Sequence, residues 1–297
     1  MNTFERVRSF LEQLAAPPGQ ICVACGNRAV LSSELPGICR HCVSLVPWVK
    51  RIRCYRCGRA VGCPDCVRAE NLSRSFELNR SAVLYDSLMR EWLAVYKYRG
   101  KERIAPLLGA ILNVAYVALQ REMTLLGNSS QKVRSLVPNR RIELNRSNAW
   151  LTSRSYSRGI WHAQAVTFVP VSQERYMERG FNQAERLAEV LSSHQRLPLI
   201  PMLKRTQHTE KQSYKSRKER VETMRNVFAI HPFASEYFNE VMADPSYISN
   251  RNPIHLILVD DVYTTGSTLE ACSRVIKEWG RAHGIHFMIY SLTWARS

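Results

Sequence analysis

Long apolar stretches are missing from this chain of 297 residues. The longest candidate, residues 104–119, is interrupted by Asn113 and follows the charged residues 101–103. Because a membrane-spanning helix needs about 20 predominantly apolar residues, we expect no membrane span. The first residues include Glu5 and Glu12 and show no signal-peptide core. We therefore expect a cytoplasmic protein.

Acidic residues are scarce relative to basic ones. The chain has 42 Lys and Arg against 25 Asp and Glu, which gives a formal net charge of +17. Such an excess makes polyanions, nucleic acids among them, plausible partners without deciding for them. The basic residues are spread along the whole sequence, so charge alone identifies no nucleic-acid groove. The hydrophobic content of 45% is sufficient for a folded core.

The eight histidines show no metal-ligand spacing, whereas the cysteines do. Eight of the nine cysteines form four C-x-x-C pairs: Cys22/Cys25, Cys39/Cys42, Cys54/Cys57 and Cys63/Cys66. Two such pairs supply the four thiolates of a tetrahedral structural zinc site. Disulfides would need an oxidising compartment, which nothing here indicates, and an iron–sulfur cluster is a more distant alternative. The ninth, Cys272, is expected to be a small buried apolar residue.

The eight cysteines predict two structural zinc ions in residues 20–70. Sequential pairing joins the first two C-x-x-C pairs into one site and the last two into another. It requires the shorter loops, so we prefer it. An interleaved arrangement, first pair with third and second with fourth, stays open. Since this segment has little core of its own, metal binding is expected to supply most of its folding free energy.

Residues 257–268, ILVDDVYTTGST, are the most informative stretch of the chain. A short run of strand-forming residues ends in Asp260 and Asp261, and a hydroxyl-rich loop around Gly266 precedes a helical pattern from Leu269. Such a strand–loop–helix unit offers backbone N–H groups, hydroxyls and a helix N-terminus to one anion. An ordinary Asp/Thr-rich turn would not explain two adjacent carboxylates before this loop.

Other segments complete the outline. Residues 165–171 predict a strand, followed by a loop that carries Arg175 and Arg179 and by a helix with Asn182 as its N-cap and Phe181 buried. The KYRGK run, residues 97–101, has two interpretations: a solvated helix end, which charge alone favours, or a phosphate or nucleic-acid contact. Residues 121–163 and 232–253 are interpreted as polar insertions without regular structure.

The 257–268 stretch resembles the phosphoribosyl pyrophosphate (PRPP) signature of type I phosphoribosyltransferases. The resemblance implies that Asp260 and Asp261 contact the ribose hydroxyls. It further implies that the loop wraps the 5′-phosphate and that PRPP binds together with Mg²⁺. The implied loop residues are Thr264, Thr265, Gly266, Ser267 and Thr268. Arg175 and Arg179 would then face the pyrophosphate, and residues 203–228 would form a lid that excludes water.

The whole order of motifs is similar to that of the ComF family. Four C-x-x-C pairs, KYRGK, VPV, RGFNQAERLA, a Gln/Arg-rich stretch and VDDVYTTGST follow one another. The family's members are phosphoribosyltransferase-like proteins with an N-terminal zinc ribbon that are associated with DNA uptake in natural transformation. The resemblance assigns Gln212 and Arg220 to the lid and suggests single-stranded DNA and a helicase-like competence ATPase as partners. Thr223 departs from the family pattern, in which Asn follows that Arg by three residues.

We therefore expect an α/β protein with a type I phosphoribosyltransferase fold, a mostly parallel sheet flanked by helices. The expected parts are a helix in residues 1–19, a double zinc ribbon in 20–70 and the phosphoribosyltransferase-like domain in 71–297. Asp260 and Asp261 are the candidate catalytic residues, and no segment dictates an acceptor nucleobase. Two alternatives stay open: a catalytically silent DNA-binding adaptor and a purine or pyrimidine salvage enzyme.

Overall fold

A computed structural model describes residues 19–63, 66, 74–98, 104–128, 160–206, 227–243 and 253–297. The predicted helix in residues 1–19 falls almost entirely outside these ranges. The lid candidates Gln212 and Arg220 also lie outside them. The chain divides into two compact units, residues 1–46 and residues 47–297. Each unit is described separately below.

The first unit is built around two C-x-x-C pairs. β1 (Gln20–Ile21) and β2 (Arg28–Ala29) pair antiparallel. α2 (Arg40–Ser44) lies near the end of the unit and contains Cys42. Gly26 adopts φ +76°, a left-handed conformation that returns the chain after Cys25. Elements this short bury little apolar surface, so the cysteines must contribute much of the stability.

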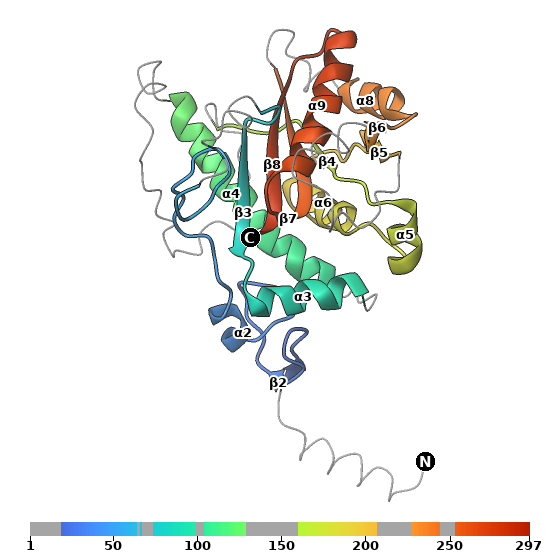
Figure 1. The fold of residues 1–297 in the computed structure, drawn as a ribbon. Coiled ribbons are helices and arrows are strands. Elements are labelled where there is room, and N and C mark those ends of the chain that lie inside the picture. Colours follow the sequence, from blue (N-terminus) through green and yellow to red (C-terminus); the bar gives the residue numbers. More distant parts are fainter. Residues whose placement is uncertain are drawn as a thin grey trace, which may run out of the picture. The chain divides into compact units, whose positions relative to one another are not determined.

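The second unit contains a four-stranded parallel sheet with the order β3-β8-β7-β4 (Figure 1). Its strands are β3 (Leu78–Leu84), β4 (Ala165–Phe168), β7 (Ile254–Tyr263) and β8 (Phe287–Arg296). Residues 256–259 of β7 are consecutively buried, so both faces of this central strand are covered. The parallel α/β class expected from the sequence is confirmed, as are the cysteine clusters of a zinc ribbon.

Helices provide that cover. α4 (Ala105–Asn128) and α6 (Gln183–Gln195) pack against each other, with α4 also contacting β3 and β8 and α6 contacting β4 and β7. A Cβ at Gly109 would overlap Val190, so the two helices touch closely at this glycine. α9 (Ser267–Ala282) packs against β7 and β8 and against the hairpin of β5 (Leu203–Arg205) and β6 (Phe228–Ile230).

Three segments differ from the sequence-based expectation. The first eight residues of the predicted insertion 121–163 continue α4, which ends at Asn128. The predicted connector 232–253 contains α8 (Ala234–Met242), whose Phe238 packs edge-on against Trp279. The loop predicted after the strand ending near residue 171 contains α5 (Gln173–Arg179). In each case the polar composition gave no periodic apolar signal for the helix, which is stabilised by capping or by one buried side chain.

Within the described residues, no helix is both long and apolar enough to cross a membrane. Among the described helices α4 is the longest, with 24 residues, and it carries Arg121 and Glu122 among its apolar residues. α3 (Ser87–Tyr98) leads from β3 toward the KYRGK run, and the Asp86 carboxylate accepts a hydrogen bond from Met89 N at 2.8 Å at its start.

Candidate functional site

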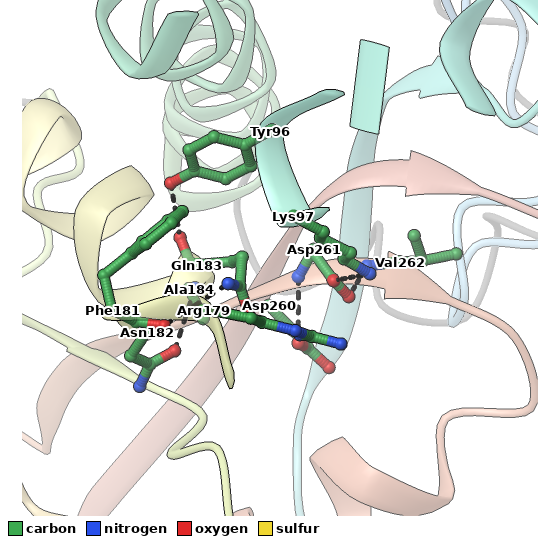
Figure 2. Close-up of polar contacts among 10 residues, drawn as sticks. All are labelled: Tyr96, Lys97, Arg179, Phe181, Asn182, Gln183, Ala184, Asp260, Asp261 and Val262. Carbon is green, nitrogen blue, oxygen red and sulfur yellow. Dashed lines mark hydrogen bonds and ion pairs between the residues drawn. The ribbon is translucent and has the colours of Figure 1, made fainter. Parts of the chain in front are cut away.

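The paired carboxylates lie near the carboxyl end of β7. Successive side chains of a strand point to opposite faces, so Asp260 and Asp261 meet different surroundings. Asp261 forms an ion pair with Lys97 of α3 and accepts a hydrogen bond from Val262 N at 2.6 Å (Figure 2). The Asp260 carboxylate accepts one from Asp261 N at 2.8 Å. The two acids are thus held by local backbone groups and one cation.

Burial and the neighbouring charge make Asp260 the unusual acid of the pair. Desolvation, followed by the charge of Asp261, raises the pKa of Asp260 to about 8. The Asp261 N–H, Lys97 and Arg205 act in the opposite direction but do not cancel the rise. Near neutral pH the free protein therefore holds a proton on Asp260 much of the time, and a cationic ligand would displace it.

The loop after β7 forms the N-terminus of α9. Gly266 adopts φ +81° and is the N-cap residue. A Cβ there would collide with the Arg74 guanidinium and the Tyr263 ring, so only glycine fits. The Thr265 and Ser267 hydroxyls lie 3.2 Å apart. α9 begins at Ser267 rather than at the predicted Leu269, which brings Ser267 and Thr268 into the first turn of the helix. Hydroxyls and helix N–H groups together suit an anion.

Lys97 is one of the site residues that sequence reasoning did not assign. Of the two interpretations of the KYRGK run, charge alone favours the solvated helix end. The structure instead places the Lys97 side chain, 19% exposed, in contact with the Asp261 carboxylate, 20% exposed. The interpretation as a solvated end is therefore wrong for this lysine. Its position in the last turn of α3 could have been inferred from the helical pattern, but its partner could not.

The expected pyrophosphate cations come from α5. Arg175 lies in its first half, and Arg179 is its last residue before Gly180, which caps the helix at φ +79°. Arg179 Nη1 donates to Gln183 Oε1 at 2.7 Å, and in Figure 2 its side chain extends toward the carboxylates. The predicted N-cap is confirmed, since Asn182 Oδ1 accepts from Ala184 N at 3.1 Å, and Phe181 is buried beside Tyr96.

Arg205, at the end of β5, adds a cation that the sequence did not single out. Burial lowers the pKa of its guanidinium, and the charge of Arg175 lowers it further, whereas Cys272 and Asp260 raise it. Arg205 therefore lies near Arg175, Asp260 and Cys272, which belong to three other elements. Cys272 is fully buried, as predicted, and burial raises the pKa of its thiol well above the ordinary value.

The eight clustered cysteines form two tetrads. One consists of Cys22, Cys25, Cys39 and Cys42, and the other of Cys54, Cys57, Cys63 and Cys66; within each, the ligand atoms lie within 4.8 Å of one another. Sequential pairing is thereby confirmed over the interleaved arrangement. Either tetrad could hold a structural zinc ion, and four sulfur donors leave no position for a substrate.

Thiol chemistry fits a metal at both tetrads. Burial opposes ionisation of Cys22, but N–H groups of Cys25, Cys39 and Ala24 outweigh it and lower its pKa to about 6. A hydrogen bond from the Cys57 thiol, against the effect of burial, lowers the pKa of Cys54 to about 4. Burial, followed by the neighbouring thiols, raises the pKa values of Cys42 and Cys66. The hydrogen bond with Cys54, followed by burial, raises the pKa of Cys57. A bound cation would balance the charge of these closely spaced sulfur atoms.

Fold and site together define an α/β protein with paired carboxylates at the end of a central parallel strand and two cysteine tetrads able to hold structural zinc. No family model matches the chain. Competence protein ComFC of Bacillus subtilis is 27% identical over 258 residues, which cover 84% of this chain and 81% of that protein. Competence protein F of Haemophilus influenzae is 33% identical over 118 residues, 39% of this chain and 45% of that protein.

Competence protein ComFC of Streptococcus pneumoniae is 29% identical over 114 residues, 38% of this chain and 41% of that protein. These matches make the chain similar to competence proteins, in the case of ComFC of Bacillus subtilis over most of both chains, and they support the resemblance to the ComF family.

Proposed function

We propose that the second unit binds PRPP at the carboxyl end of β7 and that the chain is a phosphoribosyltransferase-like protein. The observation that carries the proposal is the combination of Asp260 and Asp261 with the helix N-terminus at Gly266. In parallel α/β sheets, ligands bind beyond the carboxyl ends of the strands. A 5′-phosphate would occupy the loop of residues 264–268, and the two carboxylates would accept hydrogen bonds from the ribose hydroxyls.

The two carboxylates are better suited to a magnesium ion that binds together with the ligand than to a magnesium ion that is bound permanently by the protein. In the part of the chain that the structure describes, the groups able to hold a metal through three or more side chains are the cysteine tetrads, not the acids. Mg²⁺ is commonly held by one or two carboxylates together with substrate phosphates. Asp260 and Asp261 would hold it in that way, and the bound ion would help neutralise the pyrophosphate charge.

The cationic and the acidic side chains of the site would have different roles. Arg175 and Arg179 of α5, joined by Arg205, would hold the pyrophosphate as it leaves. The acids would stabilise positive charge that develops on the ribose ring as the bond between C1′ and the pyrophosphate oxygen weakens. Gln212 and Arg220 stay lid candidates on the sequence resemblance alone. No described residue in the site indicates which acceptor would attack C1′, so the proposal names no acceptor substrate.

We further propose a role in competence, because all three relatives carry that word in their names. A net charge of +17 is compatible with contact to single-stranded DNA during uptake. A helicase-like competence ATPase stays a suggestion of the family resemblance.

Calorimetric titration with PRPP and Mg²⁺ tests the ligand proposal. Asp261→Asn removes the charge of one carboxylate with almost no change in volume. Since a hydrogen bond to a charged group contributes about 1.5–3 kcal/mol, the dissociation constant should rise about 10- to 100-fold. Glu278→Gln, an exposed carboxylate on α9, is the matched control and should leave affinity unchanged. No binding to the wild type, or equal binding by Asp261→Asn, would reject the proposal.

A further inference from the structure

Arg296 lies between the loop after β7 and the second cysteine tetrad. Its side chain is 4% exposed, and β8 places it directly beside Tyr263 in the register of the parallel sheet. Nη1 donates to Tyr263 O at 3.0 Å and to Thr264 O at 2.8 Å, and the guanidinium lies 4.4 Å from the centroid of the Tyr263 ring. One buried cation therefore holds the last carbonyl of β7 and the first carbonyl of the loop.

Arg74 holds the third carbonyl in the row. Its Nη2 donates to Thr265 O at 3.0 Å, and its guanidinium lies against the face of Gly266 where a Cβ would otherwise project. In a trans peptide unit the C=O and the following N–H point in opposite directions. Carbonyls turned toward the two arginines therefore turn the N–H groups of residues 264–266 away from them, which is the orientation an anion needs.

The same Arg296 also contacts the second tetrad. Its Nη2 donates to Cys57 Sγ at 3.8 Å. A zinc ion with four thiolates carries a net charge of −2, so a buried guanidinium beside one sulfur compensates part of that charge. Each thiolate bound to the metal is also a better hydrogen-bond acceptor than a thiol. The metal would thus fix the position of the guanidinium that orients the loop.

The surrounding contacts make the Cys54–Cys57 turn a rigid support. Gly58 adopts φ +73°, and a Cβ there would approach Asn79 O to 2.8 Å, so the turn requires glycine at this position. Asn79 N donates to Arg56 O at 2.7 Å, and Asn79 Nδ2 donates to Cys57 O at 3.3 Å. The turn is therefore anchored to β3 from one side and linked to the loop through Arg296 from the other.

We propose that the metal–thiolate site of Cys54, Cys57, Cys63 and Cys66 orients the anion-binding loop of residues 264–268 through Arg296, a positioning residue. The inference deepens the proposed function, because it makes the second metal site part of the phosphate-binding machinery. Arg296 touches no ligand in this scheme. It acts by holding the carbonyls of Tyr263 and Thr264.

Hydrogen–deuterium exchange on the zinc-loaded full chain tests the link without relying on PRPP. Cys66→Ser removes a ligand other than Cys57, the sulfur to which Arg296 donates. Arg296→Lys keeps the charge but loses the planar fork that reaches both carbonyls and the sulfur. Arg186→Lys on α6, a partly exposed arginine paired with Glu189 at 2.9 Å, is the matched control. Zinc content per chain is measured on every sample.

Cys66→Ser should lose one zinc equivalent, and exchange of the loop amides should accelerate by about tenfold or more while α6 stays protected. Arg296→Lys should retain both zinc ions and show the same faster exchange in the loop. Arg186→Lys should match the wild type. In both loop variants the dissociation constant for PRPP with Mg²⁺ should rise about tenfold, the equivalent of 1.4 kcal/mol.

The link is overturned if Cys66→Ser loses its zinc while loop exchange stays unchanged, or if Arg296→Lys leaves the loop as protected as in the wild type. If a variant also loses protection of the α6 amides, its effect on the loop is not specific. Zinc is then removed stepwise from the wild type with a chelator, and amide exchange is measured at each step. The loop must then lose protection with release of the second zinc and before α6 does. Failure of the wild type to bind PRPP would reject the proposed function alone, since loop exchange still reports the link.

Discussion

The two cysteine tetrads offer the same four sulfur donors but lie in different surroundings. The first, Cys22 to Cys42, belongs to a unit of two-residue strands and one five-residue helix. The second, Cys54 to Cys66, lies in the unit with the parallel sheet and contacts β3 and Arg296. Identical ligand sets can therefore have different consequences: one metal would hold a small unit together, and the other would support a binding loop.

The difference follows from how much else stabilises each tetrad. Within residues 19–46 the buried aliphatic side chains are Leu35, Ile38 and Val46, and Cys39 N donates to Cys22 Sγ at 3.4 Å. Around the second, Arg80 is 2% exposed, donates to Tyr55 O at 2.8 Å and pairs with Glu122. The second tetrad should thus keep part of its shape without metal, whereas the first should not.

The largest effect is expected from Cys22→Ser in the first tetrad. Structural zinc contributes about 10–16 kcal/mol to the folding of small metal-dependent units, so residues 19–46 should unfold completely. Amides of this segment should exchange at the rate of an unfolded chain, while α6 in the second unit stays protected. Retained protection in residues 19–46 after loss of the zinc would contradict the contrast between the tetrads.

Glu122→Ala tests the support of the second tetrad. The change leaves the buried Arg80 without its carboxylate, and breaking a buried ion pair in this way costs about 3–5 kcal/mol. Urea denaturation should show that loss for the second unit, together with faster exchange in residues 54–57. The exposed pair of Lys277 and Glu77 provides the control, since Glu77→Ala should cost about 0–1 kcal/mol.

Protection by the ligand should be confined to the second unit. PRPP with Mg²⁺ at 100 times its dissociation constant should stabilise that unit by about 2.7 kcal/mol, and Asp261→Asn should abolish most of the gain. Exchange of residues 19–46 should not respond to the ligand. Equal protection of both units by PRPP would show that the first tetrad belongs to the binding machinery after all.

The smallest expected effect is a pH dependence in the second unit. The pKa of Asp260 is raised from 3.8 to about 8, so the folded state binds more protons than the unfolded state between these values. This group therefore makes the free energy of unfolding fall as pH rises through that window. Urea denaturation at several pH values within about one unit of neutrality measures this slope. The free energy of unfolding of Asp260→Asn should not show the fall with rising pH that Asp260 contributes in the wild type.

Local features of the chain could be predicted from the sequence. The strand, loop and helix of residues 257–268 are continuous, and the sequential cysteine pairs are close along the chain, so periodicity and spacing suffice. α5 was missed because none of its residues is buried and it has no apolar stripe. Its caps were the available signal: Ser172 accepts from Arg175 N, and Gly180 ends the helix.

The contacts that complete the site could not be predicted in the same way. Arg296 meets Tyr263 because β8 lies beside β7, and Arg74 meets Thr265 across 191 positions of sequence. Lys97 meets Asp261 only because α3 ends near β7. A single arginine or lysine carries no local sign of its partner, so these contacts depend on the order of the strands.

The role of the loop is tested most directly by the hydrogen-exchange footprint of PRPP and Mg²⁺ on the zinc-loaded full chain. Residues 260–268 should be protected in the wild type, and the footprint at the same residues should be weaker in Arg296→Lys. Binding that leaves residues 260–268 unprotected, or a footprint identical in both proteins, would contradict it.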